Sequence, residues 1–563
     1  MKLDLLITGA RVQTMDPARP TAHTIGVWGG RIIGLDEDVA GLPAARTLDL
    51  GGATVLPGFN DVHCHTTWFG LTLDSVDVEN LPGGMDELYS KLEAEARRLP
   101  AGEWINATGF AQQDYADQYP DLEILDRICG DHPLFLRKVS GHAAIANTLA
   151  MDKAGMLAPG FTDPEGGLVV RDSSGRPTGL VEETAQNLVQ DLIRPYSQAQ
   201  IEKVLGLATA EYAREGITSF GEAGICGGWI GHSPVEVSAY MRARTSGALK
   251  ARAQLLPAIQ TLHPITANSA DDFGTGLDLG MVTGFGDDYL SIGPTKMFMD
   301  GALSGETAAM SENYAGRDTK GYLQDEFEVL RAQALAAYRS GWSLAIHAIG
   351  DLAVKGAVDI IAEAVDTYGA PGHGGAAAGG RASALNAHPV PNRIEHAAIV
   401  PDALLPRIKE YGIAVTPQSA FADNIGDSMN TVLGGADHPR TAQLYRAKAF
   451  FDAGILLPGS SDRPCANGNV LRGIQAFVDR ATRSGAVMGS AAEKLSPLQA
   501  VQAYTTIAAQ ASGQGHLKGT LTPGKLADFV VLGADPLTVD PTTIAATEVL
   551  ATFVGGVETH TTL

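Results

Sequence analysis

Two histidines flank a cysteine in the segment "PGFNDVHCH", residues 57–65, directly after a Pro-Gly turn. If this segment is a strand, His63 and His65 point to the same side and Cys64 points away, because side chains alternate along a strand. Two neutral imidazoles placed in this way can bind one divalent metal ion such as zinc. The segment alone does not distinguish such a pair from two histidines in a polar loop.

Other polar residues that could act with this pair stand far from it in the chain. They are Lys296 in "TKMFMDG", His347 in "LAIHAIG", His396 in "RIEHA" and Asp462 in "LLPGSSD". Each lies in, or at the end of, a short apolar run of the kind that forms β-strands. A common site therefore requires a fold that brings the ends of these strands together.

Alternating helical and strand-like stretches in the middle of the chain indicate such a fold. The helical stretch "QIEKVLGLATAEYAREG" precedes the strand-like "ITSFGEAG", and "DEFEVLRAQALAAYRSG" precedes "WSLAIHAIGD". The same order recurs in "PDALLPRIKEYG" before "IAVTPQS" and in "TAQLYRAKAFFDAG" before "ILLPGSSD". Each predicted helix ends at a glycine, which helix C-termini favour. Repeated units of this type predict a parallel sheet with crossover helices.

Ten segments are strand candidates, two more than an eight-stranded barrel holds. The surplus pair, "EWINATGF" and "PLFLRKVSG", lies between residue 70 and about residue 195, with the hairpin-like "GGLVVRDSSGRPTGLVEE". Treating this region as an insertion leaves eight strands. We therefore predict an α/β fold, a (β/α)8 TIM-like barrel over residues 57–511 with a large insertion after strand 1.

Both ends of the chain are rich in short strands separated by glycine, proline and aspartate. Examples are "DLLITGARVQTM" near the beginning and "EVLATFVGGVETH" near the end. We predict that residues 1–56 and 512–563 form one composite β-sandwich domain. The alternative is two unrelated clusters of strands.

Composition excludes several classes of protein. The 563 residues are 45% hydrophobic with a formal net charge of −23, which is typical of a soluble globular protein and disfavours a nucleic-acid partner. Four scattered cysteines without a CxxC pair, and Asp4 within "MKLDLLITGA", favour a cytoplasmic protein without a signal peptide. No window approaches the roughly 20 apolar residues that span a bilayer, so no membrane partner is expected.

In the predicted barrel the polar residues come into register at the C-terminal ends of the strands, where active sites of such barrels form. The motifs HxH after "PGF", "KMFMDGAL", "HAIGD", "RIEHA", "GSSDRP" and "LTPGKLADFVVL" resemble those of the amidohydrolase superfamily. They are most similar to its family 3 branch, which includes N-substituted formamide deformylases. The resemblance reaches nearly the whole chain.

The resemblance implies a centre of two divalent metal ions, with zinc as the first candidate and manganese, iron, cobalt or nickel as alternatives. His63 and His65 would bind one ion, and His347 and His396 the other. Lys296 would be carboxylated and bridge the two ions. Asp462 would bind metal and take a proton from the bridging hydroxide.

Elementary chemistry supports these roles. A free ammonium repels a metal ion, but burial lowers the pKa of a lysine, and the neutral amine could then add carbon dioxide to form an anionic carbamate. Two bridged ions would lower the pKa of water from 15.7 to about 7. Asp462 could pass the proton to the departing nitrogen, a role usually worth roughly 10² to 10⁴ in rate.

Each assignment has a structural alternative. Lys296 could be an ordinary buried lysine paired with Asp300, or a cation that binds substrate. Asp462 could be a helix N-cap, and His347 and His396 could be core histidines. Glu395 should point away from His396 and have a structural role.

Residues outside the predicted strands could complete the site. His142, in the insertion, could stabilise an oxyanion or be a loop histidine that caps backbone groups. Asp351 could orient a ligand imidazole or cap the following helix. Four aromatic residues could line an apolar substrate pocket or belong to a core: Trp68, Phe69, Phe110 and Tyr115.

These features together predict a metal-dependent enzyme that hydrolyses the C–N bond of an N-substituted formamide or another N-acyl compound. A deaminase, or a hydrolase of cyclic amides, esters or carbamates on the same scaffold, is the nearest alternative. A non-catalytic binding protein on a degenerate barrel is a third. The expected partner is a small-molecule substrate, and a homodimer is one option for the assembly.

Overall fold

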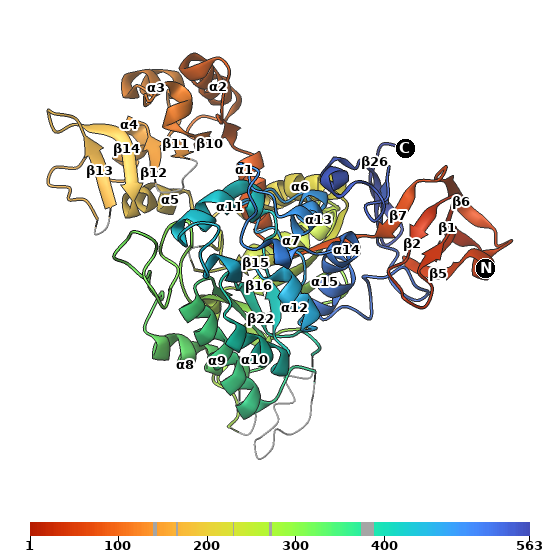
Figure 1. Ribbon diagram of the computed structural model, residues 1–563. Helices are drawn as coiled ribbons and strands as arrows, with labels where there is room; N and C mark the ends of the chain where they lie inside the picture. The colour runs from red at the N-terminus through yellow and green to blue at the C-terminus, as the bar shows by residue number, and fades with distance from the viewer. Residues whose placement is uncertain (139–142, 165–166, 229, 270–272, 373–387) are drawn as a thin grey trace. The chain divides into compact units, whose positions relative to one another are not determined.

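The computed structural model of the protein describes residues 1–563 except for 139–142, 165–166, 229, 270–272 and 373–387 (Figure 1). Contacts within the chain divide it into two units. The larger unit contains Met1–Thr66 and Thr209–Leu563, and the smaller unit contains Thr67–Ala208.

Two four-stranded parallel sheets form the centre of the larger unit. The first has the order β19-β16-β15-β8, with β8 at Phe59–Cys64, β15 at Ile217–Ile225, β16 at Arg252–Pro257 and β19 at Leu290–Ile292. The second has the order β20-β21-β22-β23, with β20 at Thr295–Phe298, β21 at Leu344–Ala348, β22 at Arg393–His396 and β23 at Ala414–Thr416. Every residue of β8 and β15 is buried, as expected for parallel strands that are covered on both faces.

Backbone contacts connect these two sheets at both edges. A parallel bridge between Ala258 and Lys296 joins β16 to β20. At the other edge, Gln418 and Ser460 form a parallel bridge, and the amide of Val62 in β8 donates to the carbonyl of Gly459 at 3.3 Å. The parallel strands and their connecting helices give an α/β fold of the TIM-barrel type.

The predicted eighth strand, "LLPGSSD", is not a regular strand. Residues 455–459 form neither a regular strand nor a helix, and only Ser460 forms a bridge. Pro458 interrupts the ladder because proline has no backbone N–H to donate. The segment nevertheless occupies the position between β23 and β8, since the amide of Val415 donates to the carbonyl of Leu456 at 2.9 Å.

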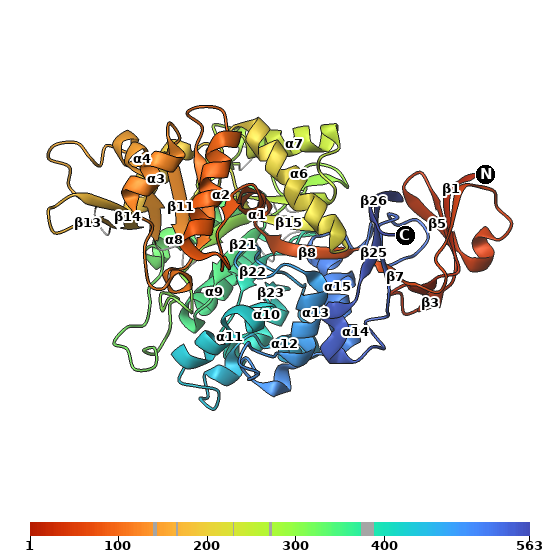
Figure 2. The same ribbon diagram turned by 90° about the horizontal axis from the view of Figure 1, so that it is seen from above.

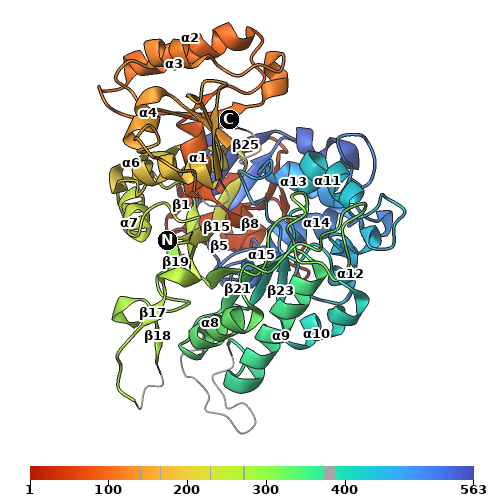
Figure 3. The same ribbon diagram turned by 90° about the vertical axis from the view of Figure 1, so that its left-hand side faces the viewer.

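Helices of the larger unit surround the parallel strands, and α8, α9 and α10 lie side by side outside β21–β23 (Figures 1 and 3). Gly341 and Gly412 follow α8 and α10 with φ of 96° and 61°, which an L side chain rarely adopts, so these helices end where the sequence predicts. The helices are α6 (Gln198–Arg214), α7 (Glu236–Ser246), α8 (Phe327–Arg339), α9 (Asp351–Tyr368), α10 (Leu405–Glu410), α11 (Phe421–Val432), α12 (Ala447–Asp452), α13 (Val470–Asp479), α14 (Pro497–Tyr504) and α15 (Thr506–Ala511).

The smaller unit has its own six-stranded sheet, in the order β13-β14-β12-β11-β10-β9. Its strands are β9 (Val76–Asp77), β10 (Ile105–Phe110), β11 (Leu134–Lys138), β12 (Ala143–Ala146), β13 (Gly167–Arg171) and β14 (Pro177–Glu183), and its helices include α2 (Gly84–Arg98), α3 (Leu122–Cys129), α4 (Thr148–Lys153) and α5 (Asn187–Ile193). The two surplus strands of the sequence are β10 and β11, and the hairpin-like stretch is the antiparallel pair β13–β14.

Strands from both ends of the chain share one sheet, in the order β26-β25-β24-β7-β2-β3 (Figure 2). These are β2 (Arg11–Gln13), β3 (Thr21–Ala22), β7 (Thr54–Pro57), β24 (Phe529–Leu532), β25 (Val549–Val554) and β26 (Val557–Thr561). A second sheet contains β1 (Leu3–Thr8), β4 (Ile25–Trp28), β5 (Arg31–Leu35) and β6 (Ala44–Asp49). The stacked rings of Phe529 and Phe553, 4.5 Å apart, belong to the apolar core that the strands of both ends share.

A buried ion pair joins this terminal sheet to the parallel strands. Arg252, at the start of β16, donates through Nε and Nη2 to the two carboxylate oxygens of Asp528 at 2.7 and 3.0 Å. The Asp528 carboxylate also accepts the Gly555 amide at 2.7 Å. Both charged side chains are less than a tenth exposed, and the Asp528 carboxylate is the closer of two that compensate Arg252, since Asp288 Oδ1 lies 3.5 Å from its Nη1.

Asp528→Ala is therefore expected to lower the free energy of unfolding by about 3–5 kcal/mol, because it removes the bidentate carboxylate and leaves the buried Arg252 guanidinium with only the longer, 3.5 Å contact to the Asp288 carboxylate. Thermal and denaturant unfolding of the two proteins would measure the loss. Glu558→Ala is the matched control, because Glu558 pairs with the half-exposed Arg46 at 2.9 Å and should contribute less than about 1 kcal/mol. Equal effects of both substitutions would contradict the prediction.

Candidate metal centre

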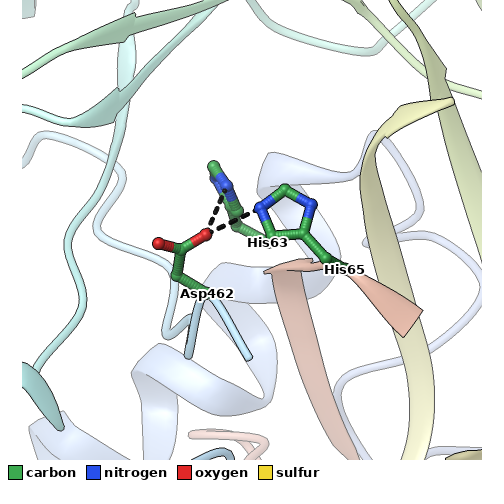
Figure 4. Close-up of side chains that lie close together, drawn as sticks. All are labelled: His63, His65 and Asp462. Carbon is green, nitrogen blue, oxygen red and sulfur yellow. Dashed lines mark hydrogen bonds and ion pairs between the residues drawn. The ribbon is translucent and has the colours of Figure 1, made fainter. Parts of the chain in front are cut away.

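His63, His65 and Asp462 form a buried cluster at the C-terminal end of β8 (Figure 4). The Nε2 atoms of His65 and His63 lie 2.9 and 3.2 Å from Asp462 Oδ1. One ligand atom from each of the three residues lies within 4.8 Å of the other two. Cys64 points away, since its Sγ donates to the Gly221 carbonyl at 3.5 Å, as strand alternation predicts.

Backbone hydrogen bonds to β8 position Asp462. The Asp462 amide donates to the His63 carbonyl at 2.8 Å, and the His65 amide donates to the Arg463 carbonyl at 2.8 Å. Asp462 has φ of 58°, an uncommon conformation for a residue with a side chain. The segment that replaces the eighth strand thus carries its carboxylate directly to the histidines of β8.

The other two predicted histidines lie beside this cluster. The ring centres of His347 and His396, at the ends of β21 and β22, are 4.4 Å apart. The centres of His396 and His63 are 5.1 Å apart. All four histidine residues are buried. The structure therefore brings the four histidines and Asp462 together.

Lys296 in β20 also reaches the cluster. Its Nζ lies 3.5 Å from His63 Nε2, and its side chain is 1% exposed. Burial lowers the pKa of the Lys296 ammonium to about 8, although the carboxylates of Glu395 and Asp462 oppose this shift. A neutral amine is therefore accessible near neutral pH.

The alternative pairing of Lys296 with Asp300 is not observed. The Asp300 carboxylate instead accepts backbone amides from Ala309, Ile349 and Gly350 at 2.8 to 3.0 Å. Its Oδ1 also lies 3.5 Å from Nε2 of His347. Asp300 thus fixes the loops that follow β20 and β21.

Electrostatics favour neutral imidazoles and an ionised carboxylate. Burial lowers the pKa of His65 to about 4 and that of His396 to about 3. Burial opposes ionisation of Asp462, but hydrogen bonds from His63 and His65 hold the pKa of its carboxyl well below the usual value. Neutral nitrogen and anionic oxygen donors are the set that zinc and related divalent ions bind, so these residues fit a metal centre.

Glu395 is a site residue that strand alternation misplaces. Glu395 and His396 should point in opposite directions, yet Glu395 Oε2 bonds Nδ1 of His63, whose ring contacts that of His396. His396 has φ of 70°, so the alternation breaks at His396 and its ring lies on the same side as the Glu395 carboxylate. Arg393 Nε and Thr416 Oγ1 donate to the Glu395 carboxylate at 2.8 and 2.6 Å and fix its position.

Similar contacts orient the other rings. Gln418 Oε1 lies 2.6 Å from Nδ1 of His396, and the Gly301 carbonyl lies 3.1 Å from Nε2 of His347. Groups of this kind set the tautomer and the direction of a ligand imidazole. Asp351 does not contribute: it begins α9 and accepts the Ser311 amide at 2.9 Å.

Glu395→Gln is expected to weaken metal binding at His63 by about 10- to 100-fold, because a neutral amide oxygen accepts from Nδ1 more weakly than a carboxylate and makes the imidazole a less basic ligand. Competition with a chelator, read by elemental analysis, would measure the change. Asp351→Asn is the control, since Asp351 bonds to Ser311, and should bind metal like the unmodified protein. Equal affinity of the Glu395 variant and the control would rule out this orienting role.

The remaining predicted residues lie elsewhere or outside the described structure. His142 is among the residues that the structure does not describe. Trp68 and Phe69 lie in α1 (Thr66–Leu73) and are half-buried. Phe110 and Tyr115 stack with ring centres 5.1 Å apart in the apolar core of the smaller unit, and the Tyr115 hydroxyl donates to the Val78 carbonyl. Phe110 and Tyr115 are therefore core residues and do not line a substrate pocket in this structure.

None of the described helices is long and apolar enough to cross a membrane.

Comparisons with known proteins identify the family. The Amidohydrolase family model matches residues 46–560. The chain is 30% identical over 574 residues to the N-substituted formamide deformylase of Arthrobacter pascens, covering 98% of each protein. It is 29% identical to Protein LONG AFTER FAR-RED 3 of Arabidopsis thaliana, covering 98% of this chain and 91% of that protein.

A solved structure supports the fold. The crystal structure of an uncharacterized metal-dependent hydrolase from Pyrococcus horikoshii OT3 aligns with a TM-score of 0.74 at 22% identity, covering 95% of this chain and 99% of that one. The chain therefore belongs to the amidohydrolase family and is a hydrolase. Its buried histidine and aspartate cluster can bind a metal ion.

Proposed function

We propose that the protein is a metal-dependent enzyme that hydrolyses the C–N amide bond of an N-substituted formamide or another small N-acyl compound. The observation that carries the proposal is the convergence of four buried imidazoles, Lys296 and Asp462 on one point at the strand ends. The full-length similarity to a formamide deformylase supports the substrate class.

The proposed architecture is a closed (β/α)8 barrel over residues 57–511 with an insertion at about 70–195. Residues 1–56 and 512–563 would form the composite β-sandwich. The bridges at both edges of the parallel sheets and the shared terminal sheet support this division. We also propose a cytoplasmic location, a small-molecule substrate and, as one option, a homodimer.

His63 and His65 would hold one divalent ion and His347 and His396 the other, with Lys296, as its carbamate, reaching both. When bound, the ions would lower the pKa of water and polarise the substrate carbonyl. The orienting contacts of Glu395 and Gln418 prepare the imidazoles for this role.

Asp462 would move the proton. Hydrogen bonds from His63 and His65 lower the pKa of its carboxyl and favour the ionised form, which would accept a proton from the attacking water and deliver it to the departing nitrogen. His142 remains a proposed donor to the oxyanion. The products would be the free amine and a carboxylic acid, which is formate for a formamide.

The test begins with the number of metal ions per chain, by elemental analysis of protein purified without chelator. About two ions, with release of amine from N-benzylformamide or related N-acyl amines, is the expected result. A single ion with ammonia release from an amino-substituted ring would favour a deaminase. Absence of metal even after zinc or manganese is supplied would overturn the proposal.

A further inference from the structure

Tyr445 has a buried hydroxyl that none of the described residues satisfies. The residue is 1% exposed, yet its hydroxyl has no hydrogen-bond partner within the part of the chain that the structure describes. A buried phenol usually finds a partner, and a buried donor left unpaired costs about 1–3 kcal/mol. The unpaired hydroxyl is explained if a bound molecule supplies the hydrogen-bond acceptor.

The position of Tyr445 points to the metal centre as the place where that molecule binds. Its amide donates to the Ala398 carbonyl at 2.8 Å, two residues beyond His396. Its side chain belongs to an apolar cluster that includes Ile349, two residues beyond His347, and Leu303, in the loop after β20. Tyr445 thus packs with residues that directly follow the strands carrying the proposed metal ligands.

The backbone of Tyr445 is strained. Its φ is 46°, and His396 and Asp462 also have positive φ, at 70° and 58°. Such conformations cost of order 1–3 kcal/mol each for residues with side chains and persist where the surroundings hold them. Arg480 Nη1 and the Ala447 amide donate to the Tyr445 carbonyl at 2.9 and 2.8 Å and fix this conformation. Tyr445 therefore shares a positive φ, which is uncommon for residues with side chains, with His396 and Asp462 of the proposed metal centre.

We infer that Tyr445 is a catalytic residue whose hydroxyl donates a hydrogen bond to the carbonyl oxygen of the substrate. This role rests on the proposed amide hydrolysis. When water attacks the carbonyl carbon, the C=O π bond opens and its electron pair moves to oxygen, so the acceptor strengthens in the transition state. Collapse of the tetrahedral intermediate re-forms C=O and expels the amine, and the phenol keeps its proton throughout.

The phenol is suited to donate without ionising. Burial, together with the negative charge of Asp462, raises the pKa of Tyr445 well above its usual value. An oxygen that carries negative charge gains more from such a donor than a neutral carbonyl does, so the contact favours the transition state over the bound substrate.

Tyr445→Phe removes only the hydroxyl and is the direct test. We expect kcat to fall by about 10²- to 10³-fold with little change in KM or metal content. The melting temperature should stay equal or rise, because the substitution removes an unsatisfied buried group.

Tyr314→Phe is the matched control. Tyr314 is 2% exposed in the same apolar cluster, but its hydroxyl donates to the Ala308 carbonyl at 2.8 Å. This variant should lose stability and keep its kcat. A fall in melting temperature for Tyr445→Phe as large as that for Tyr314→Phe would show that the Tyr445 hydroxyl has a structural partner, and would overturn the inference.

A binding measurement separates this inference from the proposed reaction. Zinc-loaded Tyr445→Phe should bind acetohydroxamate, an analogue of an amide, about 10-fold more weakly than the unmodified protein, whereas Tyr314→Phe should bind it equally. If no amide were hydrolysed but this difference appeared, the proposed reaction would fail and the ligand contact of Tyr445 would stand. Unchanged acetohydroxamate affinity, or a kcat within twofold of the unmodified protein, would remove Tyr445 from the site.

Discussion

Asp462→Asn is expected to retain most of its metal while turnover falls by roughly 10²- to 10⁴-fold. Asparagine keeps the shape of the side chain and one oxygen at the position beside His63 and His65. It has no carboxylate that can accept a proton from water and release it to nitrogen. The substitution therefore separates metal binding from proton transfer.

The measurement combines elemental analysis with the rate of amine release under saturating substrate. Asp535→Asn is a matched control, because Asp535 is also a buried carboxylate, 2% exposed, but it accepts Gln13 Nε2 at 2.9 Å near the terminal sheet. The control should keep both metal and turnover. Near-normal turnover of Asp462→Asn would remove Asp462 from the proton-transfer role.

Strand periodicity made the centre of this site predictable. Two residues that are two positions apart on a strand must share a side, and His63 and His65 do so while Cys64 contacts Gly221. The C-terminal ends of parallel strands meet at one edge, so His347 and His396 could be placed beside them from the βα pattern alone. The first inference uses the local geometry of one strand, and the second uses the order of strands and helices, and both can be read from the sequence.

The residues that orient the histidine rings were harder to predict from the sequence, because their positions depend on backbone conformations that hydrophobic periodicity does not indicate. Glu395 and His396 are neighbours that both reach the cluster, and the alternation breaks at His396, which adopts a positive φ. Gln418 contacts His396 from two residues beyond β23, near the end of the predicted strand "IAVTPQS", but its residue type did not mark it as a site residue. The prediction of a regular strand at "LLPGSSD" was wrong for a reason that the sequence contains, since Pro458 has no N–H to donate to a neighbouring strand.

The aromatic residues illustrate a different limit. A hydrophobic ring near a predicted site can line a pocket or fill a core, and composition does not distinguish the two. Phe110 and Tyr115 pack in the core of the smaller unit. Tyr445, in contrast, lies in the stretch "TAQLYRAKAFFDAG", far along the chain from the first strand. It gave no signal, because whether a buried hydroxyl finds a partner is a property of tertiary packing.

Lys296→Ala is expected to lose at least one of the two proposed metal ions. The side chain is buried against His63, and as a carbamate it would supply the anionic oxygens that balance two divalent charges. Alanine leaves a cavity at that position with no charge. Elemental analysis of the purified variant, beside the unmodified protein, would measure the loss.

Chemical rescue makes the test specific to the proposed carbamate. Formate, acetate or propionate added to Lys296→Ala during reconstitution should restore part of the metal and turnover, because each supplies a small carboxylate to the cavity. Lys518→Met is the control for removing a buried lysine. Lys518 is 6% exposed, and its Nζ donates to Ser219 Oγ near the N-terminal end of β15, away from the strand ends that carry the proposed metal ligands. It should keep its metal and show no response to carboxylates. Full metal content in Lys296→Ala without added carboxylate would exclude the bridging role and leave Lys296 as a cation that binds substrate.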